Sequence, residues 1–368
     1  MEDYGIQLTK EEEDKVDRLC ESIRNRVAKE RMTPRQRLEA VARGEEPDRI
    51  PIEVNAVGLH AAVTYGVKPP DLYADPKISL FAYLTHLERF GYDTVSPFRF
   101  SIGEAEFGGT MKTASGSIPT LMDSPVKTAA DLDKIKFPNV RKDGTLPWQL
   151  WMISVLKEKL GDIMPIYGFT AIPGGITPVI VPMGQLFLAL RNNPEFVHCL
   201  AALATKHLID YVNAMFDAGA DMVRLVGVDD QVSYKMHREF EFPYMCALVK
   251  SVKGPVSIRG AGDWSHTLDS HAEAGVEGFY AFSGMPLDKA KEWSMKHKRM
   301  LRYGVNAQVL VHGPVERIRE EVKRVIQQGW PGSRFALATD ALDYSTPPEH
   351  LDAFMEAAKE YGQLPLRI

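Results

Sequence analysis

Two adjacent carboxylates, Asp229 and Asp230, directly follow an apolar run of the β-strand type at residues 221–227. Two carboxylates that share a partly dry cleft repel each other, which raises the pKa of one of them. A carboxyl group of that kind is a general acid near neutral pH. We therefore predict that this pair is catalytic. The alternative is that one residue caps the next segment while the other faces water.

Three further residues lie in loops that follow apolar runs near the N-terminus: His60, Glu104 and Glu106. Histidine and glutamate are common proton-transfer groups, so His60 and Glu104 are predicted to be catalytic and Glu106 to bind the substrate. For His60 the alternative is simple packing. For the two glutamates the alternative is that one of them is structural.

Five polar residues at the ends of other apolar runs are predicted to bind the substrate: Asn55, Tyr167, Arg259, Asn306 and Asp340. A partly buried arginine needs a counter-charge, and Asp340 is the expected partner of Arg259. Such an ion pair would either hold two strands together or orient an anionic group of the substrate.

The elements that position these residues alternate in type along the chain. Short β-branched or aromatic runs are separated by amphipathic helical stretches, which predicts a parallel sheet. The eight runs are residues 49–54, 93–98, 163–169, 221–227, 255–260, 276–282, 300–306 and 334–340. Eight such units over about 300 residues predict an α/β fold of the closed (β/α)8 TIM-barrel type, in which chemistry belongs to the loops after the strands.

Two helices near the C-terminus carry clear boundary signals. One is expected to start at Pro314 and to be capped by Gly329, with apolar residues at helical spacing between them. The other is expected to have Thr346 as its N-cap, Pro347 in its first turn and Gly362 after its end.

The chain of 368 residues has no linker rich in proline, glycine or serine. Residues 1–31 are charged and carry a weak helical stripe, so they are expected to form an N-terminal helical arm. Residues 32–368 are then one barrel domain, since α/β barrels are often this long.

A net charge of -5 gives no general attraction to nucleic acid or to an anionic membrane. The three cysteines, Cys20, Cys199 and Cys246, form no CxxC pair, which argues for a reducing compartment. The start MEDYGIQLTKEEEDK is too acidic and polar for a signal peptide, and no apolar run is long enough to span a membrane. We expect a cytoplasmic protein.

Three stretches resemble the uroporphyrinogen decarboxylase superfamily, particularly its branch of corrinoid methyltransferases. They are MTPRQRLEAVARGEEPDRIPIEV (32–54), FGYDTVSPF with GEAEFGG (90–109), and HGPVERIREEVKRVIQQG through FALATDALDYSTPPEHL (312–351). The segment DSPVKTAADLDKIKFP (123–138) is also typical of this branch. The resemblance implies a barrel of the uroporphyrinogen decarboxylase type, with Glu104 and Glu106 in the acidic loop of the family.

Decarboxylases of this superfamily carry an arginine-rich segment after the first strand, because a polyanionic porphyrinogen needs several cations. This chain has no arginine between Arg49 and Arg89. The segment offers small, apolar and neutral polar groups instead. It therefore favours an uncharged or aromatic substrate over a porphyrinogen.

The thiol-methylating branch holds zinc with a His-x-Cys pair and a further cysteine. In this chain Ser257 and Arg259 stand at the positions of the pair, and Asp340 stands near the third position. The cysteines lie elsewhere. A thiolate-bound zinc is therefore not expected. A site of histidine and carboxylate ligands stays open as an alternative, but no HxH or HExxH spacing points to one, so no metal ligands are assigned.

The predicted activity is methyl transfer between a small methoxylated, preferably aromatic, substrate and the cobalt of a corrinoid protein, as in O-demethylation. The alternative is a methylcorrinoid:tetrahydrofolate methyltransferase. Further alternatives are a decarboxylase and a non-catalytic binding subunit. In the first two, the cobalamin does the hard chemistry while the barrel supplies position and proton control.

The expected partners are a corrinoid-binding protein and a small-molecule substrate, with tetrahydrofolate as acceptor in the alternative. A homodimer is compatible with this prediction if the barrel mouth stays exposed for docking.

Overall fold

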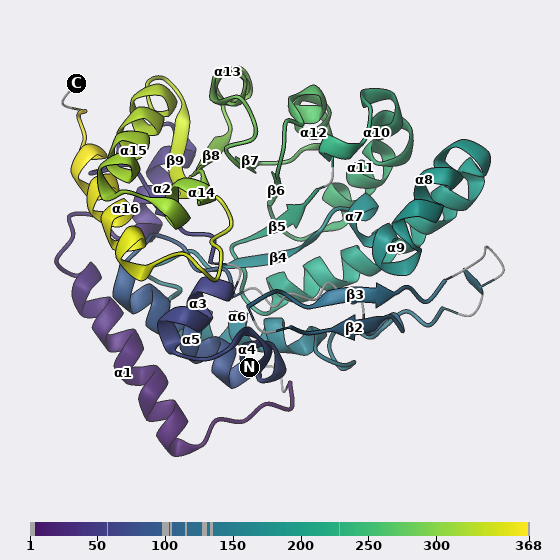
Figure 1. Ribbon diagram of the computed structural model, residues 1–368, viewed down its shortest axis with the longest axis horizontal. Coiled ribbons are helices and arrows are strands. Elements are labelled where there is room, and N and C mark those ends of the chain that lie inside the picture. Colours follow the sequence, from purple (N-terminus) through teal and green to yellow (C-terminus); the bar gives the residue numbers. More distant parts are fainter. Residues whose placement is uncertain are drawn as a thin grey trace.

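The computed structural model describes residues 4–56, 58–97, 103, 105–114, 116–126, 131–132, 135–227 and 229–366. Its centre is a seven-stranded sheet in the order β1-β9-β8-β7-β6-β5-β4, and every neighbouring pair is parallel (Figure 1). The strands are β1 (Ile52–Glu53), β4 (Tyr167–Ala171), β5 (Met222–Val226), β6 (Val256–Gly260), β7 (Gly278–Ala281), β8 (Met300–Val305) and β9 (Arg334–Thr339).

The segment around Val95 joins β1 to β4, the two edges of this sheet. The amide of Asp93 donates to the carbonyl of Ile52 on β1 at 2.8 Å. On the other side, Val95 donates to the carbonyl of Pro165 and accepts from the amide of Tyr167, at 3.3 and 2.9 Å. The segment runs parallel to β4 and closes the ring. The predicted (β/α)8 barrel is confirmed, and each of the eight predicted runs contributes a strand or this bridge.

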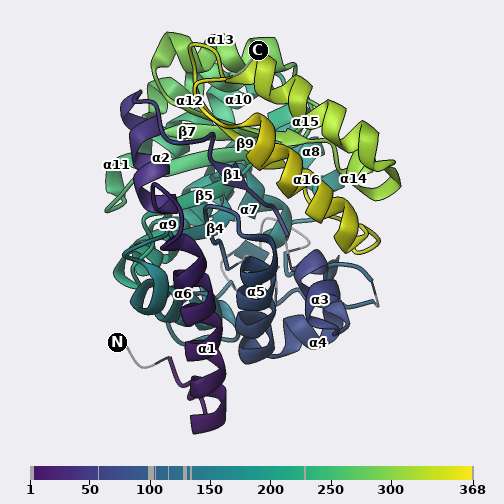
Figure 2. The same ribbon diagram turned by 90° about the vertical axis from the view of Figure 1, so that its left-hand side faces the viewer.

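Helices surround the strands in both ribbon views (Figures 1 and 2). They are α1 (Lys10–Val27), α2 (Pro34–Arg43), α3 (Leu59–Tyr65), α4 (Pro69–Ala74), α5 (Pro76–Phe90), α6 (Leu146–Leu160), α7 (Pro173–Ile180), α8 (Met183–Asn192), α9 (Pro194–Asp217), α10 (Tyr234–Phe240), α11 (Phe242–Ser251), α12 (Leu268–Ala274), α13 (Leu287–His297), α14 (Ala307–His312), α15 (Val315–Gly329) and α16 (Pro348–Tyr361). Loops at the carboxyl ends of the strands therefore lead into helices that pack back on the sheet.

The N-terminal segment forms the helix α1. Its start is a capping box, in which Thr9 and Glu12 bond each other's backbone amides. One face of α1 is apolar, and Val16, Cys20 and Ile23 on that face are buried in the main core. Figure 2 shows α1 lying beside α5 and α6.

The barrel interior is polar at its centre. Glu53 on β1 is fully buried and forms ion pairs with Arg224 on β5 and Arg302 on β8. The carboxylate accepts from Nε of Arg302 at 2.7 Å. Burial raises the pKa of Glu53, but the two arginines outweigh burial and lower it below its ordinary value.

Two helix ends differ from the predictions. Gly329 is the last residue of α15 rather than its cap, and a Cβ there would clash with the ring of Phe335 on β9. The glycine therefore serves close helix–strand packing. Pro347, not Thr346, is the N-cap of α16, while Gly362 follows its end as predicted.

An antiparallel hairpin, β2 (Thr110–Lys112) with β3 (Thr120–Asp123), was not predicted. In the described part of the chain, no single helix is long and apolar enough to cross a membrane. The pair α7 and α8 passes the same test together, by length and composition only, but is bent by 114°.

Candidate active site

Asn55 and Arg259 meet at the carboxyl end of the barrel. Nη1 of Arg259 donates to Oδ1 of Asn55 at 3.0 Å. The guanidinium carbon lies 4.8, 5.3 and 6.0 Å from the ring centroids of Phe169, Phe282 and Tyr280. Burial lowers the pKa of Arg259 to about 10, so the side chain remains charged at neutral pH. One cation is thus surrounded by three aromatic rings.

Asp340 lies in the same region, on the residue after β9. Its carboxylate accepts from the amide of Ser283 at 2.9 Å and from the hydroxyl of Ser283 at 2.6 Å. Asn306 in turn donates from Nδ2 to the Ser283 hydroxyl at 2.9 Å, while its Oδ1 accepts from the amide of Gln308. Burial raises the pKa of Asp340, although the bonds from Ser283 oppose this shift. Asp340 is therefore a buried carboxyl group with a raised pKa, held in an ordered network.

The predicted ion pair between Arg259 and Asp340 is not formed, and this prediction was wrong. Each side chain bonds a neutral residue that follows another strand: Asn55, after β1, for the arginine and Ser283, after β7, for the aspartate. Arg259 and Asp340 feel each other's charge only weakly. We call Asn55, Arg259, Ser283, Asn306 and Asp340 the mouth site.

The mouth site is shielded but still reachable, since Asn55, Arg259 and Asp340 are 7–9% exposed. Nδ2 of Asn55 and Nε of Arg259 are buried and have no hydrogen-bond partner among the described residues. Buried polar groups in folded proteins are normally bonded, so these atoms are suited to a polar ligand.

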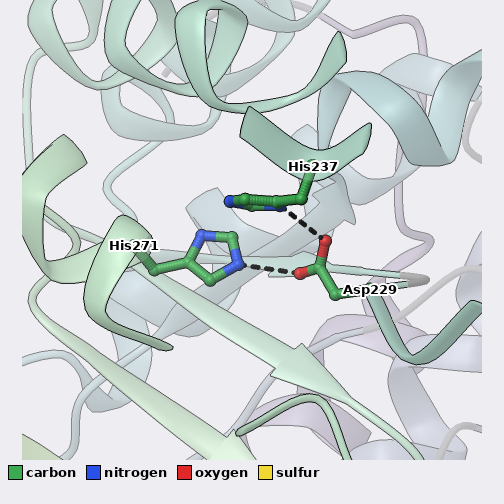
Figure 3. A group of neighbouring side chains, drawn as sticks. All are labelled: Asp229, His237 and His271. Atoms are coloured by element: carbon green, nitrogen blue, oxygen red, sulfur yellow. Dashed lines mark hydrogen bonds and ion pairs between the residues drawn. The ribbon is translucent and has the colours of Figure 1, made fainter. Parts of the chain in front are cut away.

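The two adjacent carboxylates do not share a cleft. Asp229 is buried, whereas Asp230 is exposed. Oδ1 of Asp229 lies 3.1 Å from Nδ1 of His237, and its Oδ2 lies 2.7 Å from Nε2 of His271 (Figure 3). Burial raises the pKa of Asp229, but the two histidines lower it well below its ordinary value. The predicted raised pKa is wrong for Asp229, because two histidines contact its buried carboxylate while Asp230 is exposed.

A raised carboxyl pKa does occur close by, on Glu241. Its Oε2 accepts from the amide of Gly174 at 2.6 Å, and its Oε1 has no partner among the residues that the structure describes. Burial and the charge of Asp229 raise the pKa of Glu241 well above its ordinary value. The sequence prediction missed Glu241, His237 and His271, because all three lie on helices or between them rather than after a strand.

Asp229, His237 and Glu241 line a small cavity between α7, α8, α9 and α10. Apolar side chains form most of its wall: Ile172, Met183, Leu186, Phe187, Leu190, Val197, Met236 and Phe240. An apolar cavity with a few convergent polar groups is the usual form of a small-molecule site.

Two predicted residues are buried away from the mouth site. Tyr167 lies deeper in the barrel, with its hydroxyl 3.5 Å from Nη2 of Arg302. His60 on α3 is fully buried, with Nδ1 2.8 Å from Nε2 of His86. Burial lowers the pKa of His60 to about 4, so the ring is neutral. This placement favours the packing alternative for His60.

Glu106 has a structural contact at the start of α6. Its Oε1 accepts from the amide and the hydroxyl of Thr145, at 2.7 and 2.5 Å. A carboxylate at a helix N-terminus satisfies free amides and the helix dipole. The other acidic residue of this loop, Glu104, lies outside the described residues.

The fold and the mouth site define a (β/α)8-barrel protein whose polar residues gather after the strands. The sequence model of the uroporphyrinogen decarboxylase (URO-D) family matches residues 33–361. The chain therefore belongs to the uroporphyrinogen decarboxylase family, as its motifs predicted.

Curated relatives include the uroporphyrinogen decarboxylases of Ruthia magnifica subsp. Calyptogena magnifica and Hydrogenovibrio crunogenus. The first is 25% identical over 315 residues, which are 79% of this chain and 87% of the relative. The second is 25% identical over 309 residues, which are 79% of this chain and 85% of the relative.

Solved structures with the same fold include a methyltransferase from Methanosarcina mazei, with a TM-score of 0.79 and 23% identity. The match covers 90% of this chain and 99% of the methyltransferase. A B12-independent methionine synthase from Shewanella sp. gives a TM-score of 0.54 at 12% identity, over 79% of this chain and 87% of the synthase. These likenesses concern the fold, and the reaction must be argued from the site.

Proposed function

We propose that this protein is a corrinoid-linked methyltransferase that moves a methyl group between a small methoxylated aromatic substrate and the cobalt of a separate corrinoid protein. The observation that carries the proposal is the charge of the mouth site. Among the described residues, Arg259 is the only arginine at the carboxyl end of a strand, and it already bonds Asn55. A porphyrinogen with many carboxylates needs several such cations. One cation among three aromatic rings suits a flat substrate with little charge.

The proposed proton donor is Asp340. A phenolate or alkoxide is a poor leaving group, so demethylation needs an acid at the ether oxygen. Burial keeps a proton on Asp340 at higher pH than on an exposed aspartate. Ser283 and Asn306 fix the direction of the carboxyl group through their hydrogen bonds. The corrinoid supplies the group that accepts the methyl.

Arg259 and Asn55 have a positioning role in this proposal. Nε of Arg259 and Nδ2 of Asn55 are buried donors without partners in the described part of the chain, and both suit an oxygen substituent on the aromatic ring. Holding the ring in one orientation lowers the barrier by restricting the reactants to a reactive geometry.

Two other functions have some support. A methylcorrinoid:tetrahydrofolate methyltransferase would use the same aromatic and amide groups for a flat pterin. Decarboxylation is supported by the names of the curated relatives, at 25% identity. The shifted pKa values of Asp229 and Glu241 in one cavity argue against a non-catalytic binding subunit.

The test is anaerobic and uses the visible spectrum of cobalamin, with a corrinoid protein as the second carrier. Reduced cobalamin is mixed with the protein and a series of methoxylated aromatics, and conversion to the methyl form supports the proposal. Loss of methylcobalamin only with tetrahydrofolate would support the pterin alternative instead. A third series follows carboxyl loss from uroporphyrinogen. Activity there, with none in the other two series, would refute methyl transfer.

A further inference from the structure

Asp229, His237 and His271 form a compact cluster (Figure 3). Two of them, Asp229 and His237, also line the apolar cavity. The three residues come from the segment after β5, from α10 and from α12, and they are only 1–3% exposed. Each offers one ligand atom, and these three atoms lie within 4.8 Å of one another. Two imidazole nitrogens and one carboxylate oxygen are a common ligand set for zinc and other divalent first-row metals.

The electrostatics of the cluster favour a cation. All the ion pairs of Asp229 within the described residues are with His237 and His271, and neither histidine carries a permanent charge. A second carboxyl, that of Glu241, is buried close enough to feel the charge of Asp229. Buried carboxylates without lysine or arginine partners are costly unless a metal or another cation compensates them.

The unused nitrogens of the two rings give a second, independent observation. Nε2 of His237, Nδ1 of His271 and Oε1 of Glu241 are buried, and within the part of the chain that the structure describes none of them has a hydrogen-bond partner. The ring nitrogens on the opposite sides contact Asp229, which orients both imidazoles. In each neutral ring the proton can sit on the unpartnered nitrogen, so that the nitrogen facing Asp229 presents its lone pair to an ion held between the ring and the carboxylate.

We propose that Asp229, His237 and His271 bind a divalent transition-metal ion, with zinc as the reference ion. Ligand atoms on a tetrahedral zinc at about 2.1 Å lie ~3.4 Å apart. The carboxylate–imidazole distances of 3.1 and 2.7 Å are close to that spacing, so small side-chain rotations would admit the ion.

The cavity determines which molecules could reach the remaining coordination position of the ion. Asp229 and His237 line it, together with Glu241 and a largely apolar wall. Three protein ligands with a further position open to a cavity are typical of catalytic rather than structural zinc. The open position suits a small molecule with an apolar body and one oxygen or sulfur donor. Arg259 and Asp340 do not line this cavity, so the metal site is separate from the mouth site and does not depend on the proposed methyl transfer.

The test is metal binding by the purified full-length chain after treatment with a chelator. One equivalent of Zn²⁺ or Co²⁺ is added, unbound ion is removed, and the bound metal is counted by mass spectrometry. We expect one ion per chain, and visible d–d bands of low-coordinate Co²⁺. His237→Gln and His271→Gln should each weaken binding roughly 100-fold or more, since even indirect ligand contacts change affinity 10- to 100-fold.

The matched control is His297→Gln, which removes a histidine paired with Asp269 at the surface. This variant should bind the ion as the natural chain does. Circular dichroism and thermal melting of each variant separate lost folding from lost binding. A natural chain that retains no ion overturns the proposal, whatever the variants do. Equal retention by the natural chain, His237→Gln and His271→Gln also overturns it.

Discussion

Replacing Glu53 with glutamine should destabilise the barrel strongly. The substitution keeps the size of the side chain but removes the negative charge between Arg224 and Arg302, which are 4% and 3% exposed. The glutamine amide also turns one acceptor into a donor that faces arginine donors. Removing one partner of a buried ion pair costs about 3–5 kcal/mol, because the remaining charges stay buried and unpaired.

The effect is large enough to measure by thermal unfolding. A chain of 368 residues has an unfolding entropy on the order of 0.8 kcal/mol/K, so a loss of 3–5 kcal/mol lowers the Tm by about 4–6 °C. Glu45→Gln is the control, because Glu45 pairs with Arg43 at the surface and both side chains are more than half exposed. That change should alter the free energy of unfolding by less than about 1 kcal/mol.

The pH dependence gives a second readout. The pKa of Glu53 is lowered in the folded state, so its stabilisation is present above the unfolded value of about 4.3 and is lost as the pH falls through the folded value. The difference between the natural chain and Glu53→Gln should therefore shrink in acid. Replacing Glu53, Arg224 and Arg302 together with apolar residues should recover much of the loss. A single variant within about 1 kcal/mol of the natural chain would refute this reasoning.

Three further predictions concern other parts of the molecule. Gly329→Ala should lower the free energy of unfolding by about 1–3 kcal/mol, because the added Cβ would clash with Phe335. Gly184→Ala on α8, where the added Cβ meets no described atom within 4 Å, should raise it by up to about 1 kcal/mol. Denaturant unfolding of both variants measures these changes, and stabilisation by both would contradict the packing argument. Burial lowers the pKa of His207 from 6.5 to about 4, so between these pH values the unfolded chain binds more protons than the folded chain. Stability is therefore lost as the pH falls from 6.5 to 4. His207→Phe should flatten this part of the curve of stability against pH, and an unchanged slope would show that His207 is not its source. Asp340→Asn should lower the rate of ether demethylation by about 10²-fold or more with little change in KM, and a full rate in this variant would exclude Asp340 as the acid.

The strands could be predicted because most of their residues are buried on both faces of the sheet. The run at 334–340, for example, forms β9 (Arg334–Thr339), with five of its six residues buried. The hairpin of β2 and β3 could not be predicted in this way, since most of its residues are exposed and carry no burial pattern. Gly329 shows a related limit, because its role depends on a ring from a later strand.

The sequence indicates which residues lie near one another after the strands, but not which of them form hydrogen bonds with each other. Barrel geometry places residues such as Asn55, Arg259 and Asp340 near one another whatever their identities. Which of them bond is decided by side-chain reach within a few ångströms, and the sequence has no signal for that. His237 and His271 come from different helices, so no sequence spacing relates them to Asp229.

The pairing of β1 with β9 has a consequence for the order of events during synthesis. Ile52 pairs with Leu337, so the ring cannot close until nearly the whole chain has left the ribosome. At about 5–20 residues per second, the edge of β1 waits roughly 15–60 s for its partner. Asp93 bonds Ile52 and also pairs with Arg37 and Arg49, all of which lie in the N-terminal part of the chain. These local contacts can hold β1 in place early, while its free edge remains the surface most open to mispairing with other nascent chains.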